Sequence, residues 1–389
     1  MRKKVAILLP WLKMGGTNKV ALRFIRELTQ FCDITLILSQ DTGELKSEIP
    51  DNVQVIIDKM QDFKDIFKED VSRIRIGYLI RDFIYYAKIK IKRDSIDNYK
   101  YLVRRHADIN TEKFDCAISY HGQSPERLLN LLYRINAEKK VAWIHGEMSF
   151  SKRDCMKMAK YYSKLDHFFF VSKPTMVSFQ NRININSAKC TVYYNPLDEN
   201  EIIRLSHAMM DIEFDKEYVN ILTVGRISAE KGQDMIPKIT NNLISKGYKV
   251  RWYVIGDGDM RPKLECLIRE NSVENEVILL GLKTNPYCYM KACDIYVQPS
   301  YTEGYSTTIC EAGILGKAII GTAPSGGIRD QITDGNDGLI VDATVEGLTV
   351  GITKLIKNEK LRHSFEKEIQ KKDFSGKGEI SKFLSYLSE

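Results

Sequence analysis

The sequence lacks a long apolar run and the features of a secreted protein. Its longest apolar run, VAILLPWL at residues 5–12, has eight residues, whereas a transmembrane helix needs about 20. Residues 1–20 pass directly into a short buried-strand pattern, without the small-residue cleavage site of a signal peptide. We therefore expect a cytoplasmic protein without a spanning helix.

Paired cysteine motifs are also missing. The eight cysteines are scattered, no Cys-x-x-Cys occurs, and the six histidines have no partner at metal-ligand spacing. A zinc site is therefore not expected. Scattered cysteines of this kind are typical of reduced, buried thiols in a cytosolic protein.

The length and the charge distribution describe a chain of two parts. At 389 residues the chain exceeds what one hydrophobic core usually supports, which predicts two domains. Residues 1–195 carry 34 Lys and Arg against 22 Asp and Glu, a net charge of +12, and the remainder has a net charge of −5. This asymmetry indicates that the first half meets an anionic partner.

Two series of apolar runs alternate with helical patterns. Nearly continuous apolar runs are typical of parallel strands that are covered on both faces. We therefore predict an α/β protein with two Rossmann-like, doubly wound parallel-sheet domains, at residues 1–195 and 196–370, and a C-terminal helix within 371–389 that packs back on the first domain. The predicted strands are residues 4–9, 34–39, 53–58, 116–120, 140–146 and 167–172, then 219–225, 249–256, 276–281, 294–300, 318–322 and 338–342.

The stretch VGRISAEKGQD, residues 224–234, follows a strand and opens a helix. Arg226 stands at the carboxyl end of the strand, and Lys231 precedes the helix. Ligands of open α/β sheets bind at that edge, and helix N-termini favour anions. The two cations would suit a diphosphate, although cations near a turn are more often ordinary surface charges.

The stretch PSYTEGYSTTICEAGILGKAII, residues 299–320, places two glutamates across a strand-to-helix turn. Glu303 would lie in the loop and Glu311 in the helix. Their spacing leaves structural alternatives open: Thr308 and Glu311 could form a capping box, and Glu303 could be a solvated loop acid. The sequence IGDGDMR at 255–261 resembles an Asp-x-Asp metal motif, but its aspartates are better interpreted as turn or cap residues.

Taken together, these motifs resemble the retaining family 4 glycosyltransferases, which have the GT-B fold. The pattern PSxxEGxxxxxxEAxxxGxxxI is accompanied by VGRxxxxKG upstream and by GGIRDQITDGNDGLIVD downstream. In the first half GGTNKVAL, WIHGE, FVSK and YYNPLD match in order. The resemblance thus covers nearly the whole chain.

The resemblance implies roles for four charged residues. Arg226 and Lys231 would bind the diphosphate of a sugar nucleotide and stabilise it as the leaving group. Glu303 would contact hydroxyls of the donor sugar near its anomeric carbon. Glu311 would hold the hydroxyls of the nucleotide ribose.

It also implies roles for several loops. Gly15 and Gly16 would approach the phosphates, His145 would face the anomeric carbon and the acceptor, and the loop at Leu282 would border the base. Backbone amides would meet the sugar and the β-phosphate at Tyr305, Ser306, Thr307 and Thr308. Neither a metal nor another cofactor is implied, since the sugar nucleotide is itself a substrate.

The sequence departs from the family pattern at a few positions. Tyr305-Ser306 stands where a Phe-Gly pair is common, Lys317 where proline is usual, and Asn18 where glutamate is common. These departures bear on the identity of the donor sugar more than on the type of reaction.

Residues 73–105 hold ten Lys and Arg against three Asp. On a helical wheel Arg81, Lys88 and Lys92 share one face and apolar residues share another, which is typical of a helix that docks on an anionic membrane. A core helix with a solvated face, or an edge strand at KIKIKR, remains an alternative.

We therefore expect a metal-independent, retaining hexosyl- or N-acetylhexosaminyltransferase. Its donor would be a nucleotide-sugar, and we expect a UDP-sugar. Its acceptor would be a lipid-linked or cell-surface glycan, and it would act at the inner face of the membrane in polysaccharide biosynthesis. A GT-B-fold UDP-sugar epimerase is the alternative enzyme. A nucleic-acid-binding protein is the non-enzymatic alternative, but the basic half has no recognition module and we expect no nucleic acid partner.

Overall fold

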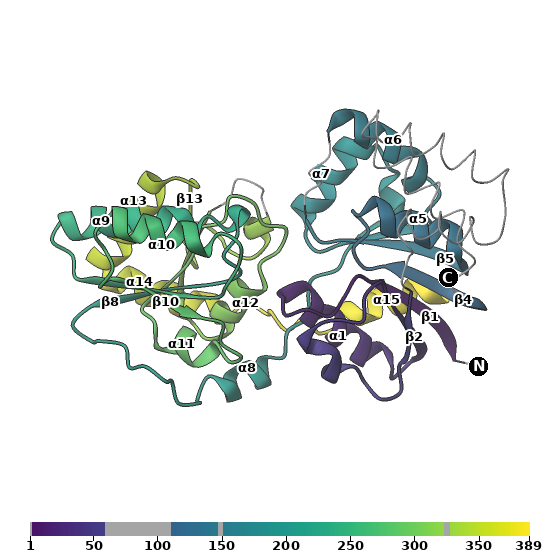
Figure 1. Ribbon diagram of the computed structural model, residues 1–389, viewed down its shortest axis with the longest axis horizontal. Helices are drawn as coiled ribbons and strands as arrows, with labels where there is room; N and C mark the ends of the chain where they lie inside the picture. The colour runs from purple at the N-terminus through teal and green to yellow at the C-terminus, as the bar shows by residue number, and fades with distance from the viewer. Residues whose placement is uncertain (1, 59–109, 147–150, 323–326) are drawn as a thin grey trace, which may run out of the picture. The chain divides into compact units, whose positions relative to one another are not determined.

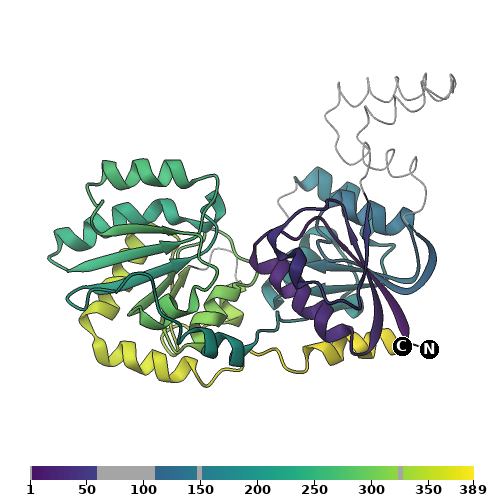
Figure 2. The same cartoon turned by 60° about the horizontal axis from the view of Figure 1, so that its bottom comes forward.

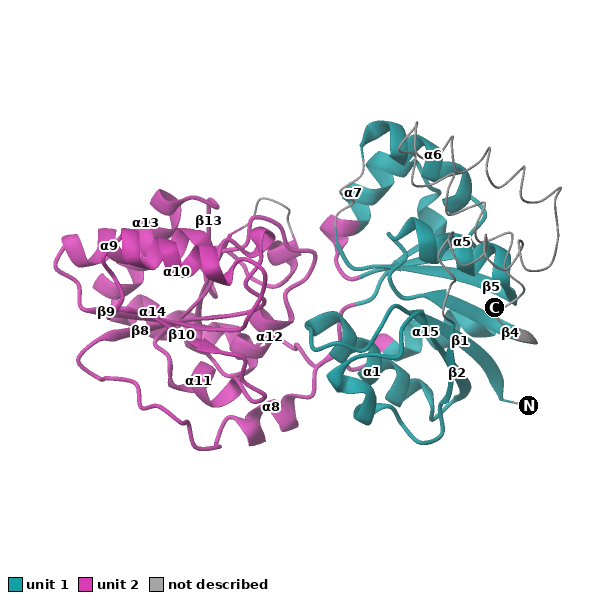
Figure 3. Ribbon diagram, in the orientation of Figure 1, with its two compact units in different colours: residues 1–170, 176–193, 380–389 teal, residues 171–175, 194–379 magenta. Residues whose placement is uncertain are grey.

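The computed structural model describes residues 2–58, 110–146, 151–322 and 327–389, and the basic stretch at 73–105 lies outside them. The described chain divides into two compact units (Figure 3). Unit 1 consists of residues 1–170, 176–193 and 380–389, and unit 2 of residues 171–175 and 194–379. Both are α/β units with an all-parallel sheet, so the predicted fold class is confirmed.

Unit 1 has a seven-stranded sheet in the order β3-β2-β1-β4-β5-β6-β7. The strands are β1 (Lys3–Leu9), β2 (Cys32–Leu38), β3 (Gln54–Ile57), β4 (Asn110–Ser119), β5 (Ile135–Ile144), β6 (His167–Phe170) and β7 (Cys190–Val192). Around them lie α1 (Gly16–Leu28), α5 (Pro125–Arg134), α6 (Lys152–Tyr162), most of α7 (Lys173–Ile183) and α15 (Glu379–Ser388) (Figure 1). The predicted strands of this half are all present, but β7 was not predicted.

The C-terminal helix α15 packs on an aromatic cluster of unit 1. The Phe383 ring lies 5.3 Å from that of Phe24 and 5.7 Å from that of Phe169, between centroids. The Lys139 ammonium donates a hydrogen bond to the Tyr386 carbonyl at 2.8 Å. Aromatic pairs at such distances add roughly 0.5–1.5 kcal/mol beyond the burial of their area.

Unit 2 has a six-stranded sheet in the order β10-β9-β8-β11-β12-β13. The strands are β8 (Val219–Val224), β9 (Val250–Ile255), β10 (Val277–Gly281), β11 (Ile295–Gln298), β12 (Ala318–Thr322) and β13 (Leu339–Val341), as predicted within a few residues. The helices are α8 (Glu199–Leu205), α9 (Ile236–Ser245), α10 (Arg261–Glu270), α11 (Tyr287–Ala292), α12 (Thr307–Ile314), α13 (Val345–Lys357) and α14 (Glu359–Ile369).

Helices cover both faces of the unit 2 sheet, as Figure 2 shows. One apolar cluster joins β8, β9 and β11 to α9, α10 and α13, and the other joins the opposite side of the same strands to α8, α11 and α12. Burial on both faces explains why these strands are continuous apolar runs. No helix in the described part of the chain combines the length and the apolar character needed to cross a membrane.

Candidate active site

The site lies where the strand order of unit 2 changes direction. The chain runs outward from β8 through β9 to β10 and then returns to β11, which pairs with β8 on its other side. At such a switch point the loops that leave two adjacent strands diverge, and ligands of open α/β sheets bind there. The loop after β8 carries Arg226 and Lys231, and the loop after β11 carries Glu303.

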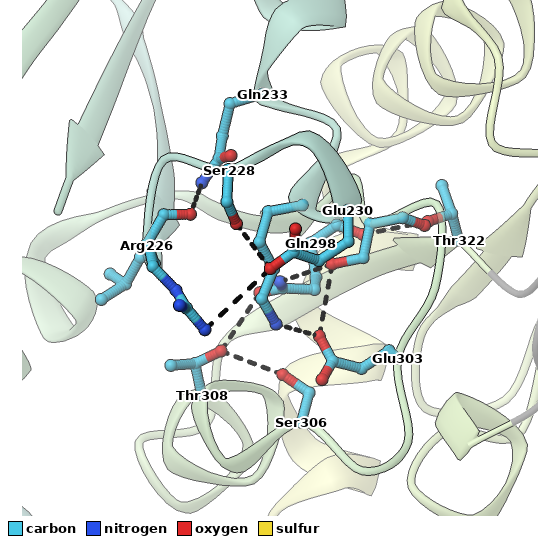
Figure 4. A network of polar contacts seen from close by, with 12 residues as sticks. Arg226, Ser228, Glu230, Gln233, Gln298, Glu303, Ser306, Thr308 and Thr322 are labelled. Atoms are coloured by element: carbon cyan, nitrogen blue, oxygen red, sulfur yellow. Dashed lines mark hydrogen bonds and ion pairs between the residues drawn. The ribbon is translucent and has the colours of Figure 1, made fainter. Parts of the chain in front are cut away.

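Lys231 and Glu303 form a close ion pair, shown in Figure 4 with its neighbours. The Lys231 Nζ lies 2.6 Å from the Glu303 Oε2, and the two side chains are 21% and 15% exposed. The Ser300 hydroxyl donates to the same carboxylate oxygen at 3.3 Å. Because a lysine ammonium has three donors, Lys231 can hold Glu303 and still bind an anion.

The two loops are fastened to each other by their backbones. The Glu230 carbonyl accepts hydrogen bonds from the Tyr301 N–H at 2.9 Å and the Thr302 N–H at 3.4 Å. Gly232 has a φ of +67°, and a Cβ there would lie 2.0 Å from the Pro299 carbonyl oxygen. Only glycine therefore lets the β8 loop pass this close to the β11 loop, which brings Lys231 to Glu303.

Arg226 is held far more loosely. Its side chain is 72% exposed, and its guanidinium lies 4.0 Å from the Glu230 carboxylate. Exposed ion pairs of this length contribute little to stability. Such an arginine can reorient toward an arriving anion at small cost.

The N-terminus of α12 faces the same loops. Ser306 is its N-cap residue, and no side-chain hydrogen bond caps the helix within the described chain. Gln331 holds Ser306 from behind: its Oε1 accepts from the Ser306 N–H at 3.1 Å and its Nε2 donates to the Ser306 carbonyl at 2.6 Å. The Ser306 N–H therefore already donates a hydrogen bond to Gln331. The helix itself begins with Thr307 and Thr308.

Glu311 does not take part in the capping box that the sequence left open. Since Ser306 is the N-cap, Thr308 already lies inside α12 and cannot cap it. Glu311 is 9% exposed, and its carboxylate accepts a hydrogen bond from the Tyr287 hydroxyl at 3.3 Å. Tyr287 thus joins the set of side chains around the predicted ribose site.

The remaining predicted positions of unit 2 differ in exposure. Leu282, in the loop after β10, is 68% exposed. Tyr305 is partly buried and packs on Tyr194 with 5.5 Å between ring centroids. Burial raises the pKa of the Tyr305 phenol well above its usual value, so this group acts as a neutral hydrogen-bonding hydroxyl.

Gly15, Gly16 and His145 belong to unit 1, at the ends of its strands. Gly15 is the N-cap of α1, so the helix begins before Thr17, the polar residue that the sequence favours as its N-cap. His145 follows β5, and its Nε2 is buried without a hydrogen-bond partner among the described residues. Burial lowers the pKa of His145 to about 3, which keeps the imidazole neutral, and the backbone of Tyr120 opposes this shift.

The IGDGDMR turn has a structural explanation. The Asp257 Oδ1 accepts a hydrogen bond from the Gly258 N–H at 2.8 Å, and its carboxylate lies 3.8 Å from the Arg261 guanidinium. Asp257 is therefore a turn residue, as expected. No three His, Cys, Asp or Glu side chains within the described ranges are grouped so that they could hold a metal ion.

Sequence reasoning missed the buried amides and hydroxyls behind the ion pair. Gln298 ends β11 and is 3% exposed, and Gln331 is fully buried. The one available signal was the polar Gln298 at the end of the apolar strand IYVQ. Gln331 gave none, because its partner Ser306 lies 25 residues away in the sequence.

Comparisons with known proteins show what part of the chain is similar to a known family. Residues 208–372 match the model of the glycosyl transferases group 1. The chain is 28% identical over 206 residues to the N-acetylgalactosamine-N,N'-diacetylbacillosaminyl-diphospho-undecaprenol 4-alpha-N-acetylgalactosaminyltransferase of Campylobacter jejuni, covering 53% of this chain and 54% of that one. It is 28% identical over 191 residues to the capsular polysaccharide biosynthesis glycosyltransferase CapM of Staphylococcus aureus, covering 45% and 46%.

The chain thus spans about half the length of these curated relatives. Its fold is similar to the crystal structure of HepE from Anabaena in complex with UDP and glucose, with a TM-score of 0.72 and 16% identity over 99% of both chains. The architecture is that of the GT-B fold. Residues 208–372, which include the β8 and β11 loops, are thus similar to the glycosyl transferases group 1.

Proposed function

We propose that this protein is a retaining, metal-independent glycosyltransferase of glycan or polysaccharide biosynthesis. Its donor is a UDP-sugar that carries a hexosyl or N-acetylhexosaminyl group, and its acceptor is a lipid-linked or cell-surface glycan. It works in the cytoplasm at the inner face of the cell membrane. The match of residues 208–372 to the glycosyl transferases group 1 supports the transferase class, and the finer assignments rest on the site and on the relatives.

The observation that carries the proposal is the Lys231–Glu303 pair beside Arg226 and the N-terminus of α12. Charge-assisted hydrogen bonds contribute roughly 1.5–3 kcal/mol each, and a helix dipole adds about 0.3–1 kcal/mol. Two cations and a helix N-terminus can therefore stabilise the negative charge that develops on a departing diphosphate. The neighbouring carboxylate suits the hydroxyls of the attached sugar.

The reaction requires one bond to form and one to break at the anomeric carbon. The acceptor hydroxyl attacks on the face from which the diphosphate leaves, so the configuration is retained. The anomeric carbon–phosphate oxygen bond breaks, the new glycosidic bond forms, and the leaving phosphate takes the proton of the acceptor. Arg226 and Lys231 bind the diphosphate throughout, and no covalent nucleophile is assigned.

The comparisons support the donor and acceptor classes. HepE was crystallised with UDP, with UDP and glucose, and with UDP-glucose. The Campylobacter relative is named for a diphospho-undecaprenol acceptor, and one from Staphylococcus aureus for poly(ribitol-phosphate). These names are why we propose a UDP-sugar and a glycan or lipid-linked acceptor.

A panel of sugar nucleotides tests the proposal. A donor should raise the melting temperature, because a ligand that binds only the folded state stabilises it by mass action, and it should be slowly hydrolysed. A lipid-linked glycan should then accept the sugar with retained configuration. Release of an epimerised sugar nucleotide without an acceptor would instead indicate the epimerase, and binding to none of the panel would overturn the proposed donor site.

Removal of either cation provides the first mutational prediction. Arg226→Ala and Lys231→Ala should each lower kcat by roughly 10²–10³, as losing a donor to developing charge does elsewhere. Lys238→Ala on α9 is the matched control, since Lys238 is exposed in the same unit outside these loops. If either site variant keeps near-parental turnover at saturating donor, its diphosphate role is wrong.

A further inference from the structure

A chain of buried hydrogen bonds runs behind the Lys231–Glu303 pair, with Gln298 at its centre (Figure 4). The Gln298 Oε1 accepts from the Tyr296 hydroxyl at 2.9 Å and from the Thr308 hydroxyl at 3.1 Å. Its Nε2 donates to the Ser300 Oγ at 2.9 Å. Ser300 in turn donates to the Glu303 Oε2 at 3.3 Å.

The direction of these bonds is set by the amide. An amide nitrogen only donates, so the Ser300 oxygen must accept from Gln298, and the single Ser300 proton remains for another acceptor. That acceptor is the Glu303 carboxylate, which also receives the Lys231 ammonium. Both donors meet the same oxygen, Oε2, and so fix the carboxylate in one orientation.

The backbone at the end of β11 does not need the Gln298 side chain to stay in place. The Thr223 hydroxyl, from β8, donates to the Val297 carbonyl at 2.7 Å. The Thr322 hydroxyl, from β12, donates to the Ser300 carbonyl at 2.5 Å. Since the strand end is held from both neighbouring strands, the Gln298 amide serves the side chains beyond it.

We propose that Gln298 is a positioning residue that orients the Glu303 carboxylate toward the donor sugar, by holding Ser300 as a hydrogen-bond donor to it. The same amide also holds the first turn of α12, because it accepts a hydrogen bond from the Thr308 hydroxyl. The Thr308 Oγ1 lies 3.0 Å from the Ser306 Oγ at the start of that helix. One buried side chain thus joins the carboxylate to the helix N-terminus. This inference rests on the donor site proposed above.

Gln298→Glu tests the direction of the chain at constant shape. A carboxylate at position 298 cannot donate to Ser300, so the Ser300 hydroxyl donates to it instead and Glu303 loses the hydrogen bond from Ser300. We expect kcat with the UDP-sugar selected by the panel to fall about 10–100-fold, as for a lost oriented contact. Affinity for UDP itself should stay within about twofold of the parent, because UDP lacks the transferred sugar that Glu303 is proposed to contact.

Ser300→Ala is the second variant, and it removes only the hydroxyl. It should reproduce the loss seen in Gln298→Glu, and the double variant should be no worse than either single one, because both changes remove the same hydrogen bond. Thr240→Val is the matched control: it removes a buried hydroxyl that donates to the Ile236 carbonyl in α9, outside the site. It should leave kcat, the affinity for UDP and the affinity for the UDP-sugar unchanged.

The outcomes separate this inference from the donor site itself. Parental kcat and UDP-sugar affinity in Ser300→Ala, with Lys231→Ala impaired, would overturn the role of Gln298 and leave the donor site standing. Additive losses accompanied by equal weakening of UDP binding would show that Gln298 only supports the fold. If Lys231→Ala is also silent, the donor site is wrong.

Discussion

At the scale of single residues, the site separates charges that are held from charges that can move. Lys231 is fixed by Glu303 at 2.6 Å, whereas Arg226 is 72% exposed and only loosely paired. We expect Lys231 to define the position of the diphosphate and Arg226 to close on it after binding. When the donor binds, Arg226 is then the one of these two cations whose side chain loses conformational entropy, because Lys231 is already held.

Glu311 allows a clear test of the ribose assignment, because it does not cap α12. Glu311→Gln should leave the helix intact, yet it removes a charge-assisted bond to a hydroxyl. Donor affinity measured by calorimetry should fall about tenfold, near 1.4 kcal/mol. Glu346→Gln, an exposed change of the same charge on α13, is the control. Unchanged affinity in the Glu311 variant would mean that this carboxylate serves the fold, through Tyr287, and not the ribose.

At the scale of elements, local sequence patterns predicted the strands well and the helix starts poorly. Twelve apolar runs predicted from the sequence all form strands, because burial on both faces requires continuous apolar residues. The short strand β7, with only partly buried residues, gave no such signal. Thr17, a plausible N-cap from the sequence, lies inside α1, and Thr308, the first residue of the alternative capping box, lies inside α12, because Gly15 and Ser306 are the N-cap residues.

The polar side chains behind the site could not be predicted for a different reason. Gln331 holds Ser306, and Gln298 joins Ser300 to Thr308, across turns of the fold that no local rule describes. A buried glutamine in a sequence looks like any other polar residue until its partners are known. The positions of Arg226 and Lys231 at the end of a strand could be predicted from the local pattern, whereas the roles of the charged residues rest on the resemblance and stay predictions.

Gly232→Ala tests whether the close approach of two loops makes the ion pair. A side chain at a φ of +67° costs about 1–3 kcal/mol, and its Cβ would also overlap the Pro299 carbonyl oxygen at 2.0 Å. The loops must then separate, so turnover should fall together with the melting temperature. Gly247→Ala is the matched control, since its φ is +85° but no atom lies within 4 Å of its Cβ. Equal effects of the two changes on turnover would contradict the loop-closing role.

At the scale of the whole molecule, the charge asymmetry predicts membrane docking. Basic residues near an anionic leaflet contribute about 1 kcal/mol each. Reversing Arg81, Lys88 and Lys92 to Glu should therefore weaken sedimentation with phosphatidylserine vesicles by several kcal/mol, and high salt should do the same to the parent. The control reverses three exposed lysines of unit 2 to Glu, at Lys238, Lys246 and Lys263. It changes the net charge by the same amount and should have little effect on sedimentation with the vesicles.

Donor hydrolysis should persist in the triple reversal at 81, 88 and 92, because its positions lie far along the chain from the Arg226 and Lys231 loop. Neutral vesicles should bind the parent weakly from the start. Equal sedimentation of the mutant and the parent with anionic vesicles would show that this stretch does not dock, and the acceptor would then have to be reached by another surface.

Three partly buried histidines of unit 1 predict that the molecule loses stability in mild acid. Burial lowers the pKa of His121 well below its usual value, that of His145 to about 3 and that of His167 to about 4. The unfolded chain then binds more protons than the folded one below about pH 6.5, so the free energy of unfolding falls as the pH falls. Above that pH all three are neutral in both states, and this contribution no longer changes.

His145→Asn tests this dependence, with stability measured by urea unfolding from pH 7 to pH 4. The slope should flatten by up to about 1.4 kcal/mol per pH unit, because one group that is protonated only on unfolding has been removed. Stability at pH 7 should also fall, since the ring packs 4.7 Å from Tyr120 between centroids, so the slope and not the intercept is decisive. A His145 variant with the parental slope would show that this imidazole titrates alike in the folded and unfolded chain.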